Sequence, residues 1–449
     1  MNHRPRAAQL ACLALLAACA TGAQAQPQPD ANATSLKSAV EQQLDASYPS
    51  LDALYKDIHA HPELSFQETR TAATLAREMR KLGFEVTEGV GKTGVVAIYR
   101  NGKGPTVMVR TELDALPMEE KTGLPYASKV TVDWRGKPTP VAHSCGHDLH
   151  MTTWVGAART LVSLKERWHG TLMFVAQPAE EQGGGAVAMI KDKIFERFGK
   201  PDYAFALHVV PEPVGFIGLS PGAATSNSDA LEIRFKGRGG HGSGPDKTID
   251  PIMMASRFVV DVQSVVSREK NPQEFGVVSI GAIQGGTAGN IIPDDVVLRG
   301  TVRSFMPDVR EKMLTGVRRT ALAAATMSGA PEPDVRIDAG GAAVMNDARL
   351  LASTEAVLRS AYGDGVTRVP PVTASEDYSE FVNVGVPSLY FTVGVYDKQR
   401  YLDSRKPGAK TLPANHSPFF APVPEPSIKT GAGAMSLAVL GVMSRPAEN

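Results

Sequence analysis

The segment AHSCGHDLH, residues 142–150, places three histidines, one cysteine and one aspartate within nine positions. Cys145 and His147 are two residues apart, directly ahead of a helix expected to start near Met151. Thiolate and imidazole groups are strong ligands for zinc-like ions, and Asp148 is either a further ligand or a group that orients a ligating imidazole. The alternative is a polar loop with a structural cysteine. The spacing favours a metal site, and no CxxC or further HxxxH pattern elsewhere points to a structural zinc.

A second candidate site is QPAEE, in which Glu180 and Glu181 follow an apolar run and a proline. Adjacent glutamates are commonly a solvated surface, but here the chain leaves a strand where a pocket is expected. Carboxylates that act on opposite sides of a glycosidic bond stand roughly 5–9 Å apart. Neighbouring carboxylates suit another division, in which one binds metal and the other activates water as a general base. Beside Cys145 and His147, this second interpretation is favoured.

Other candidate residues stand singly. His208 lies near the end of an apolar run and His416 lies in the loop NHSPFF, and each is as compatible with a structural role as with a functional one. The glycine-rich loops RGGHGSGP and GGTAGNIIPD match no phosphate-binding motif and are compatible with tight turns. Within these loops, His241 and Asn290 are candidates to donate hydrogen bonds to a substrate reached by domain closure.

Apolar runs of strand length alternate with helical stretches, and the runs end in polar residues. TVMVRTELDAL ends in Glu112 and Asp114, TLMFVAQPAEE ends in the two glutamates, and YAFALHVV carries His208. The alternation predicts an α/β sheet covered by helices on both faces. Because sites in open α/β sheets form beyond the carboxyl ends of the strands, these side chains are expected to converge.

The pattern changes between residues 223 and 335. Strand ALEIRFKG, a helix over about 250–268, strands GVVSIGAI and VVLRGTVRSF, a helix over about 308–328 and strand DVRID follow in turn. This βαββαβ order is that of the ferredoxin-like split unit. We therefore expect an inserted domain at 223–335 between the two parts of a larger domain, 26–222 and 336–449.

The N-terminus is expected to be a leader rather than part of the fold. Two arginines precede a short apolar run, which indicates a signal peptide over residues 1–25 and an exported protein, periplasmic or secreted. AQAQ fits ordinary cleavage, whereas LAAC fits a lipobox that would lipidate Cys19 and anchor a lipoprotein. The folded part then keeps Cys145 alone, which excludes an internal disulfide.

Two further local predictions concern the first helix and the segment before it. The polar residues 27–38 are expected to form a flexible link. SFQE, residues 65–68, has the spacing of a capping box, and Gly83 is expected to end the helix that follows.

Composition and charge bear on the number of domains and on one class of partner, nucleic acid. The chain has 449 residues, 43% of them hydrophobic, so two or three domains with sizeable cores are expected. Lys and Arg together number 47, as do Asp and Glu. With no basic excess, a nucleic acid partner is not expected.

The ordered motifs resemble those of a known family. They are HAHPELSFQETRTA, RTELDALP, HSCGHDLH, QPAEEQGGGAVAMI, GGTAGNIIPD, LRGTVRSF, ASEDYSEF and NHSPFF. Between about residues 50 and 420 they are similar to the M20 metallopeptidases, and most similar to the amidohydrolase branch with hippurate hydrolases and plant auxin-conjugate amidohydrolases. The resemblance implies a zinc-exopeptidase-like α/β catalytic domain with an inserted ferredoxin-like lid that often dimerises, and hence a homodimer.

The resemblance also implies a set of metal ligands. Cys145 is similar to the bridging thiolate of a two-metal site, with His147 and Glu181 on one side and His208 and His416 on the other. The ions would be two divalent cations. The thiolate suggests zinc, and the resemblance also implies manganese, cobalt or nickel, with which enzymes of this branch are often active.

The remaining roles follow in the same way. Glu180 resembles the general base, and Asp114 a supporting residue of the site. His241 is similar to the lid histidine that stabilises the oxyanion, in dimers often from the neighbouring subunit. Asn290 and Arg303 match positions near the substrate, and the planar fork of Arg303 suits a carboxylate.

These residues imply a metal-dependent amidohydrolase that cleaves N-acyl amino acids or similar conjugates with a free carboxylate. A dipeptidase or carboxypeptidase of the same family is the nearest alternative, and a non-catalytic metal-binding envelope protein is another. The stretch before His143, residues 129–142, is longer than is usual in this branch and is expected to reshape the acyl pocket.

Overall fold

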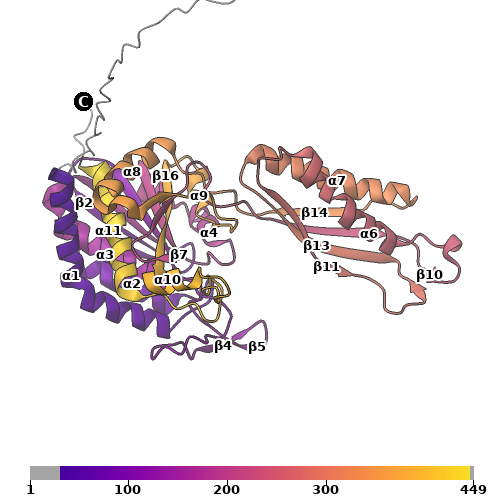
Figure 1. Cartoon of the computed structure of the whole chain (residues 1–449), viewed down its shortest axis with the longest axis horizontal. Coiled ribbons are helices and arrows are strands. Elements are labelled where there is room, and N and C mark those ends of the chain that lie inside the picture. The colour runs from indigo at the N-terminus through magenta and orange to yellow at the C-terminus, as the bar shows by residue number, and fades with distance from the viewer. Residues whose placement is uncertain (1–30, 445–449) are drawn as a thin grey trace, which may run out of the picture.

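The structure is a computed structural model that describes residues 31–444, with side-chain surroundings from residue 35 to residue 444. The expected signal peptide and Cys19 lie outside these residues. The described chain forms a large unit and a small unit, joined by two crossing segments (Figure 1). The small unit lies between the two sequence halves of the large one, which confirms the predicted α/β fold with an inserted domain.

The large unit is built on a mixed sheet, which in the described residues has the order β1-β2-β6-β3-β7-β16-β8-β15. Its strands are β1 Glu85–Val90, β2 Gly94–Asn101, β3 Thr106–Glu112, β6 Gly170–Gln177, β7 Tyr203–Pro213, β8 Ile217–Leu219, β15 Val366–Arg368 and β16 Ser388–Tyr396. Strands β6, β3, β7 and β16 run parallel to one another in the middle of the sheet. Their buried apolar residues explain the continuous hydrophobic runs in the sequence.

Helices cover both faces of this sheet, as predicted. One face packs against α1 Ala31–Ala60, α2 Thr69–Lys81, α3 His147–Ser163, α8 Ala348–Tyr362 and α11 Pro424–Met443. The other face packs against α4 Gly185–Lys191, α5 Ile194–Phe198 and α9 Ser379–Asn383. Helices α3 and α11 approach closely because both carry small residues, and a Cβ atom at Gly156 would lie 3.1 Å from that of Ala432.

The small unit is an antiparallel sheet with the order β11-β13-β9-β14, which two helices cover. Its elements are β9 Asp229–Lys236, α6 Pro251–Asp261, β11 Gly276–Gln284, β13 Asp295–Ser304, α7 Pro307–Met327 and β14 Asp334–Ala339. The βαββαβ order is therefore confirmed. The helix expected over 250–268 is shorter, because a π-helical turn, Val265–Glu269, follows α6. At the far end, β10 Gly240–His241 pairs with β12 Ile291–Ile292 (Figure 1).

Two local predictions were wrong. Residues 31–38 belong to helix α1 and are not a flexible link, because the apolar side chain of Val40 and those after it bury one side of that helix against α11. The capping box at 65–68 does not form either. Helix α2 starts at Thr69 without a side-chain cap from its N-cap residue Glu68, because Ser65 and Glu68 make their hydrogen bonds elsewhere. The helix does end at Gly83, whose φ of +87° closes it.

The unusual stretch before the metal-ligand motif forms a hairpin. Strands β4 Thr131–Trp134 and β5 Lys137–Pro140 pair with each other and project from the large unit (Figure 1). The hairpin packs through Val132 and Trp134 on a small apolar cluster around Leu64. Within the described part of the chain, no helix combines the length and the apolar character that crossing a bilayer requires.

Candidate active site

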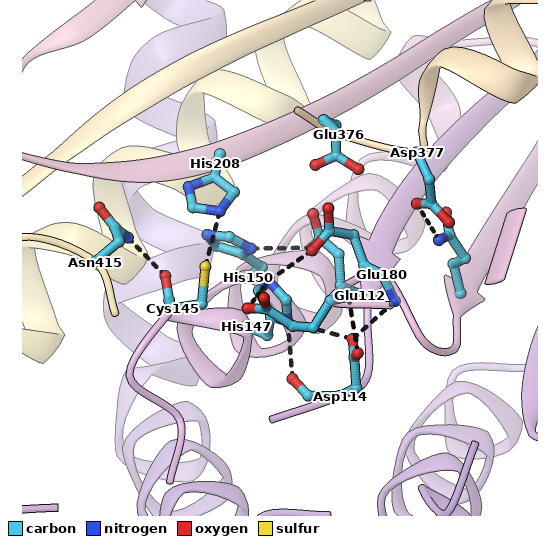
Figure 2. Close-up of polar contacts among 12 residues, drawn as sticks. Glu112, Asp114, Cys145, His147, His150, Glu180, His208, Glu376, Asp377 and Asn415 are labelled. Atoms are coloured by element: carbon cyan, nitrogen blue, oxygen red, sulfur yellow. Dashed lines mark hydrogen bonds and ion pairs between the residues drawn. The ribbon is translucent and has the colours of Figure 1, made fainter. Parts of the chain in front are cut away.

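The expected ligands converge at the carboxyl ends of the central strands, and Figure 2 shows three of them, Cys145, His147 and His208. Cys145 and His147 lie at the start of α3, Glu181 follows β6, His208 is on β7, and His416 lies in the loop after β16. Side-chain donors of Cys145, His147 and His208 lie within 4.8 Å of one another, as do those of Cys145, Glu181 and His416. Both triads share the cysteine sulfur, which is the arrangement that two cations around one bridging thiolate need.

His147 belongs to a second group of donor atoms as well, since it also lies within 4.8 Å of Glu180 and Glu181. His208 joins His147 because its Nε2 lies 3.4 Å from the sulfur of Cys145. His416 reaches the cluster from the opposite loop, and its Nε2 lies 3.3 Å from Oε1 of Glu181. The contact of His147 with Glu181 is longer, at 3.9 Å. The five residues are those expected, and their division between two ions stays a prediction.

Hydrogen bonds leave Nε2 of two histidines free to bind metal. His147 Nδ1 lies 2.8 Å from the backbone oxygen of Asp114, and His208 Nδ1 lies 2.8 Å from that of Val209. A carbonyl oxygen only accepts, so in each ring Nδ1 carries a proton, and in the neutral imidazole Nε2 then has the lone pair that a metal ion needs. In contrast, Nε2 of His150 accepts a hydrogen bond from the N–H of Val209. His150 is therefore not available as a ligand.

The site suits divalent cations on the chemistry of its own atoms. His147 Nε2 is buried and has no hydrogen-bond partner among the described residues. Burial and the neighbouring Glu181 and Glu180 raise the pKa of the Cys145 thiol, and a cation in contact with the sulfur offsets both effects. Sulfur, imidazole and carboxylate donors together are a set that zinc-like ions prefer.

A strained turn carries the glutamate pair. Ala179 is fully buried and has a φ of +49°, in the left-handed region that residues other than glycine rarely adopt. The backbone N–H groups of Glu180 and Glu181 donate to Asp114 at 3.1 and 3.0 Å. Asp114 therefore holds the turn through its carboxylate, while its backbone oxygen orients His147. Asp114 thus contacts Glu180, Glu181 and His147, as its predicted supporting role requires.

The two glutamates differ in charge preference. Burial, followed by the charge of Glu376, raises the pKa of Glu180 well above its ordinary value. Burial also acts on Glu181, but contact with the imidazoles of His416 and His147 outweighs it and lowers the pKa. Glu181 is thus suited to bind a metal ion as a charged carboxylate, and Glu180 is suited to take up a proton.

A cavity of about 980 Å³ opens over the cluster. Its walls include Cys145, Glu180 and His208 from the large unit, and Arg303 from β13 of the small unit. The described residues that line it include neither His241 nor Asn290, which lie together on the β10–β12 turn at the far end of the small unit. The β4–β5 hairpin does not line the cavity either, so the expectation that this stretch reshapes the pocket is not supported.

A buried network around Arg110 was missed by the sequence analysis. The guanidinium donates to Glu376 at 2.8 Å, to Asp377 at 3.2 Å and to Glu112. Glu112 in turn accepts from Nδ1 of His150 at 3.0 Å (Figure 2). The only sequence signal for this network was the position of Glu376 and Asp377 in the motif ASEDYSEF.

Asp148, which the sequence offered as a possible metal ligand, instead contacts Nδ1 of His59 on α1 at 2.7 Å.

The fold and the cluster define a metal-dependent hydrolase with an exopeptidase-like α/β domain and an inserted lid. Residues 108–435 match Peptidase family M20/M25/M40, and the chain belongs to this family. The resemblance seen in the motifs is thereby confirmed.

Three known proteins show the relationship in detail. The hippurate hydrolase of Campylobacter jejuni is 44% identical over 257 residues, which are 57% of this chain and 64% of that enzyme. Thermostable carboxypeptidase 1 of Saccharolobus solfataricus is 35% identical over 387 residues, 85% of this chain and 92% of that protein. The crystal structure of a dinuclear metal binding peptidase from family M20 of Bacillus subtilis superposes with a TM-score of 0.73 at 28% identity, covering 89% and 99% of the two chains.

Proposed function

We propose that the protein is a metal-dependent amidohydrolase that cleaves the amide bond of N-acyl amino acids or similar conjugates with a free carboxylate. The observation that carries this proposal is the pair of ligand triads sharing Cys145, with Glu180 beside them in one cavity. The similarity to a hippurate hydrolase, whose name describes an acylated amino acid as substrate, supports the choice of substrate class.

Two divalent cations would be held by Cys145, His147, Glu181, His208 and His416. When bound, they supply a Lewis acid for the scissile carbonyl and a lowered pKa for the attacking water. The dinuclear relative supports the number of ions. Zinc is the first candidate because of the thiolate, and manganese, cobalt and nickel are to be tested beside it.

Glu180 is the general base of the proposed reaction. Its buried carboxylate has a raised pKa, so it holds the proton taken from the attacking water until the leaving amine receives it. Arg303 faces the cavity and has no ion pair among the described residues, so its guanidinium is available to the substrate carboxylate.

His241 and Asn290 would serve the site of a second subunit. They are far from the cavity of their own subunit, and the small unit exposes apolar side chains on α6 and on its edge strand β11. Val260 is 71% exposed and Ile283 is 56% exposed, which suits a surface covered in a homodimer. The oxyanion contact of His241 would then come from the partner.

The protein is also proposed to be exported, either free in the periplasm or medium or anchored through Cys19. This part of the proposal is supported only by the leader sequence.

Two other functions are distinguishable. A dipeptidase or carboxypeptidase would use the same chemistry, and the similarity to a carboxypeptidase favours it as the second candidate. A metal-binding protein without turnover would have no use for a base beside the ligand Glu181.

The test is amide hydrolysis by residues 26–449 reconstituted with each metal, on matched N-acyl amino acids and dipeptides. Glu180→Gln should keep both metal ions and lower kcat by about 1000-fold, because only the proton acceptor is lost. Glu181→Gln, the matched change one residue along, should lower the metal content instead. Preference for dipeptides would establish the peptidase function, and full activity of Glu180→Gln would exclude the mechanism.

A further inference from the structure

The segment between α1 and α2 lies against the turn that carries Glu180. We propose that Glu68 is a positioning residue for Glu180, because its carboxylate holds the left-handed backbone of Ala179 and so sets the direction of the next side chain. The inference rests on the proposed function, in which Glu180 is the general base.

Both carboxylate oxygens of Glu68 are engaged. Oε1 accepts the backbone N–H of Ala179 at 2.8 Å, and Oε2 accepts the hydroxyl of Thr93 at 2.6 Å. Glu68 is fully buried, so water does not compete for these contacts. Thr93 belongs to the turn between β1 and β2, and Glu68 therefore ties a distant part of the sheet to the turn.

The Ala179 backbone needs such a support. Its φ of +49° is unfavourable for a residue with a Cβ atom, and strained residues persist only where their surroundings fix them. The carbonyl of Ala179 accepts the N–H groups of Gly184 and Gly185 at 3.3 and 3.2 Å. A Cβ atom at Gly185 would lie 1.5 Å from the oxygen of Pro178, so the loop has little room to relax.

Two carboxylates divide the turn between them. Asp114 accepts the N–H groups of Glu180 and Glu181, and Glu68 accepts that of Ala179. Asp114 also contacts His147, so changing it would disturb a metal ligand. Within the described residues, the side-chain hydrogen bonds of Glu68 go to Thr93 and Ala179 and to no metal ligand. Glu68 is therefore the group through which Glu180 can be displaced without touching the ligands.

The simpler alternative is that Glu68 serves helix α2. Glu68 is the N-cap residue of α2, but its side chain makes no cap hydrogen bond. The side chain of Glu63 caps the helix instead, since it accepts hydrogen bonds from the N–H groups of Arg70 and Thr71 at 3.1 and 2.7 Å. The side chain of Glu68 is thus free of the helix and committed to the catalytic turn.

The protonation state of Glu68 does not decide the contact. Burial raises its pKa to about 7, and either form presents an oxygen to the N–H of Ala179. Glutamine presents the same oxygen, and its amide N–H can donate to the oxygen of Thr93. Glu68→Gln is accordingly the conservative variant and Glu68→Ala the disruptive one.

The experiment compares Glu68→Ala, Glu68→Gln and the matched control Glu63→Ala in the metal-loaded enzyme. We expect Glu68→Ala to lower kcat by about 100-fold, with KM changed by less than about threefold and the metal content unchanged, as misplacement of a catalytic group does. Glu68→Gln should recover kcat to within about fivefold of wild type, and Glu63→Ala should leave it unchanged. In the Glu180→Gln background, Glu68→Ala should cause no additional loss, because both changes act on the same group.

Several results would overturn the inference. These are an unchanged kcat in Glu68→Ala, a change in KM alone, a loss of metal, or a full additional loss in the Glu180→Gln background. If Glu68→Ala does not fold, Thr93→Val tests the inference in its place. This change removes the hydrogen bond from the Thr93 hydroxyl to Glu68 and should lower kcat by about tenfold. Failure of the proposed function is recognised separately, by an inactive wild type or by a fully active Glu180→Gln.

Discussion

At the scale of single residues, the site depends on buried charges that are paired or hydrogen bonded. Arg110 is buried with three carboxylates around it, and it connects β3 with Glu376 and Asp377 of the second half of the large unit. Removing one partner of a buried ion pair leaves the other charge without compensation. The network therefore stabilises the region behind Glu180 and holds residues that are far apart in the sequence.

Arg110→Met should destabilise the protein by about 3–5 kcal/mol, because three carboxylates stay buried without their cation. The measurement is the midpoint of urea unfolding. Arg100→Met on the preceding strand β2 is the matched control, since its pair with Glu85 is exposed and such pairs contribute only about 0–1 kcal/mol. Equal effects of the two changes would contradict the structural role of Arg110.

At the scale of elements, a buried histidine joins the end of α1 to the start of α3. His59 Nδ1 lies 2.7 Å from Asp148, and Nε2 lies 3.1 Å from Glu120 in the loop after β3. Burial lowers the pKa of His59, but the two carboxylates outweigh it and raise the pKa from 6.5 to about 10. The folded protein therefore holds this proton more tightly than the unfolded chain does.

This difference predicts how stability depends on pH. The stabilisation by His59 is fully present below its unfolded pKa of 6.5 and is lost as the pH rises towards about 10. We expect the Tm of wild type to fall more steeply between these values than that of His59→Gln. His61→Gln, two residues further along and exposed, should follow the wild-type curve. Parallel curves for wild type and His59→Gln would contradict the prediction.

At the scale of the whole molecule, the cavity takes its walls from both units, and the small unit also places His241 far from it. A small unit that serves only as a wall would need no distal histidine. In a two-fold dimer joined through the small units, each distal turn would reach the other subunit. Cavity and turn would then form one site from two chains.

Mixing two inactive variants tests this arrangement. In a dimer of Glu180→Gln with His241→Ala, one of the two sites receives an intact Glu180 and an intact partner histidine. We expect equal mixtures, exchanged under mild denaturant, to recover about a quarter of wild-type activity. If His241 acts in its own subunit, no activity returns. Val260→Asp should give monomers by light scattering and lower the activity with them.

The residue types of the site, the α/β and βαββαβ order of elements and the family were all predictable from the sequence, because ligand spacing and hydrophobic periodicity are local properties. That Cys145 and His208 lie together could not be read from the sequence, because these residues are 63 positions apart and come from the start of α3 and from β7. The same holds for SFQE, where a local pattern suggested a helix cap. Buried carboxylates and a strained backbone from other elements offered Ser65 and Glu68 hydrogen bonds that replaced the cap, and such long-range competition is not encoded in any one segment.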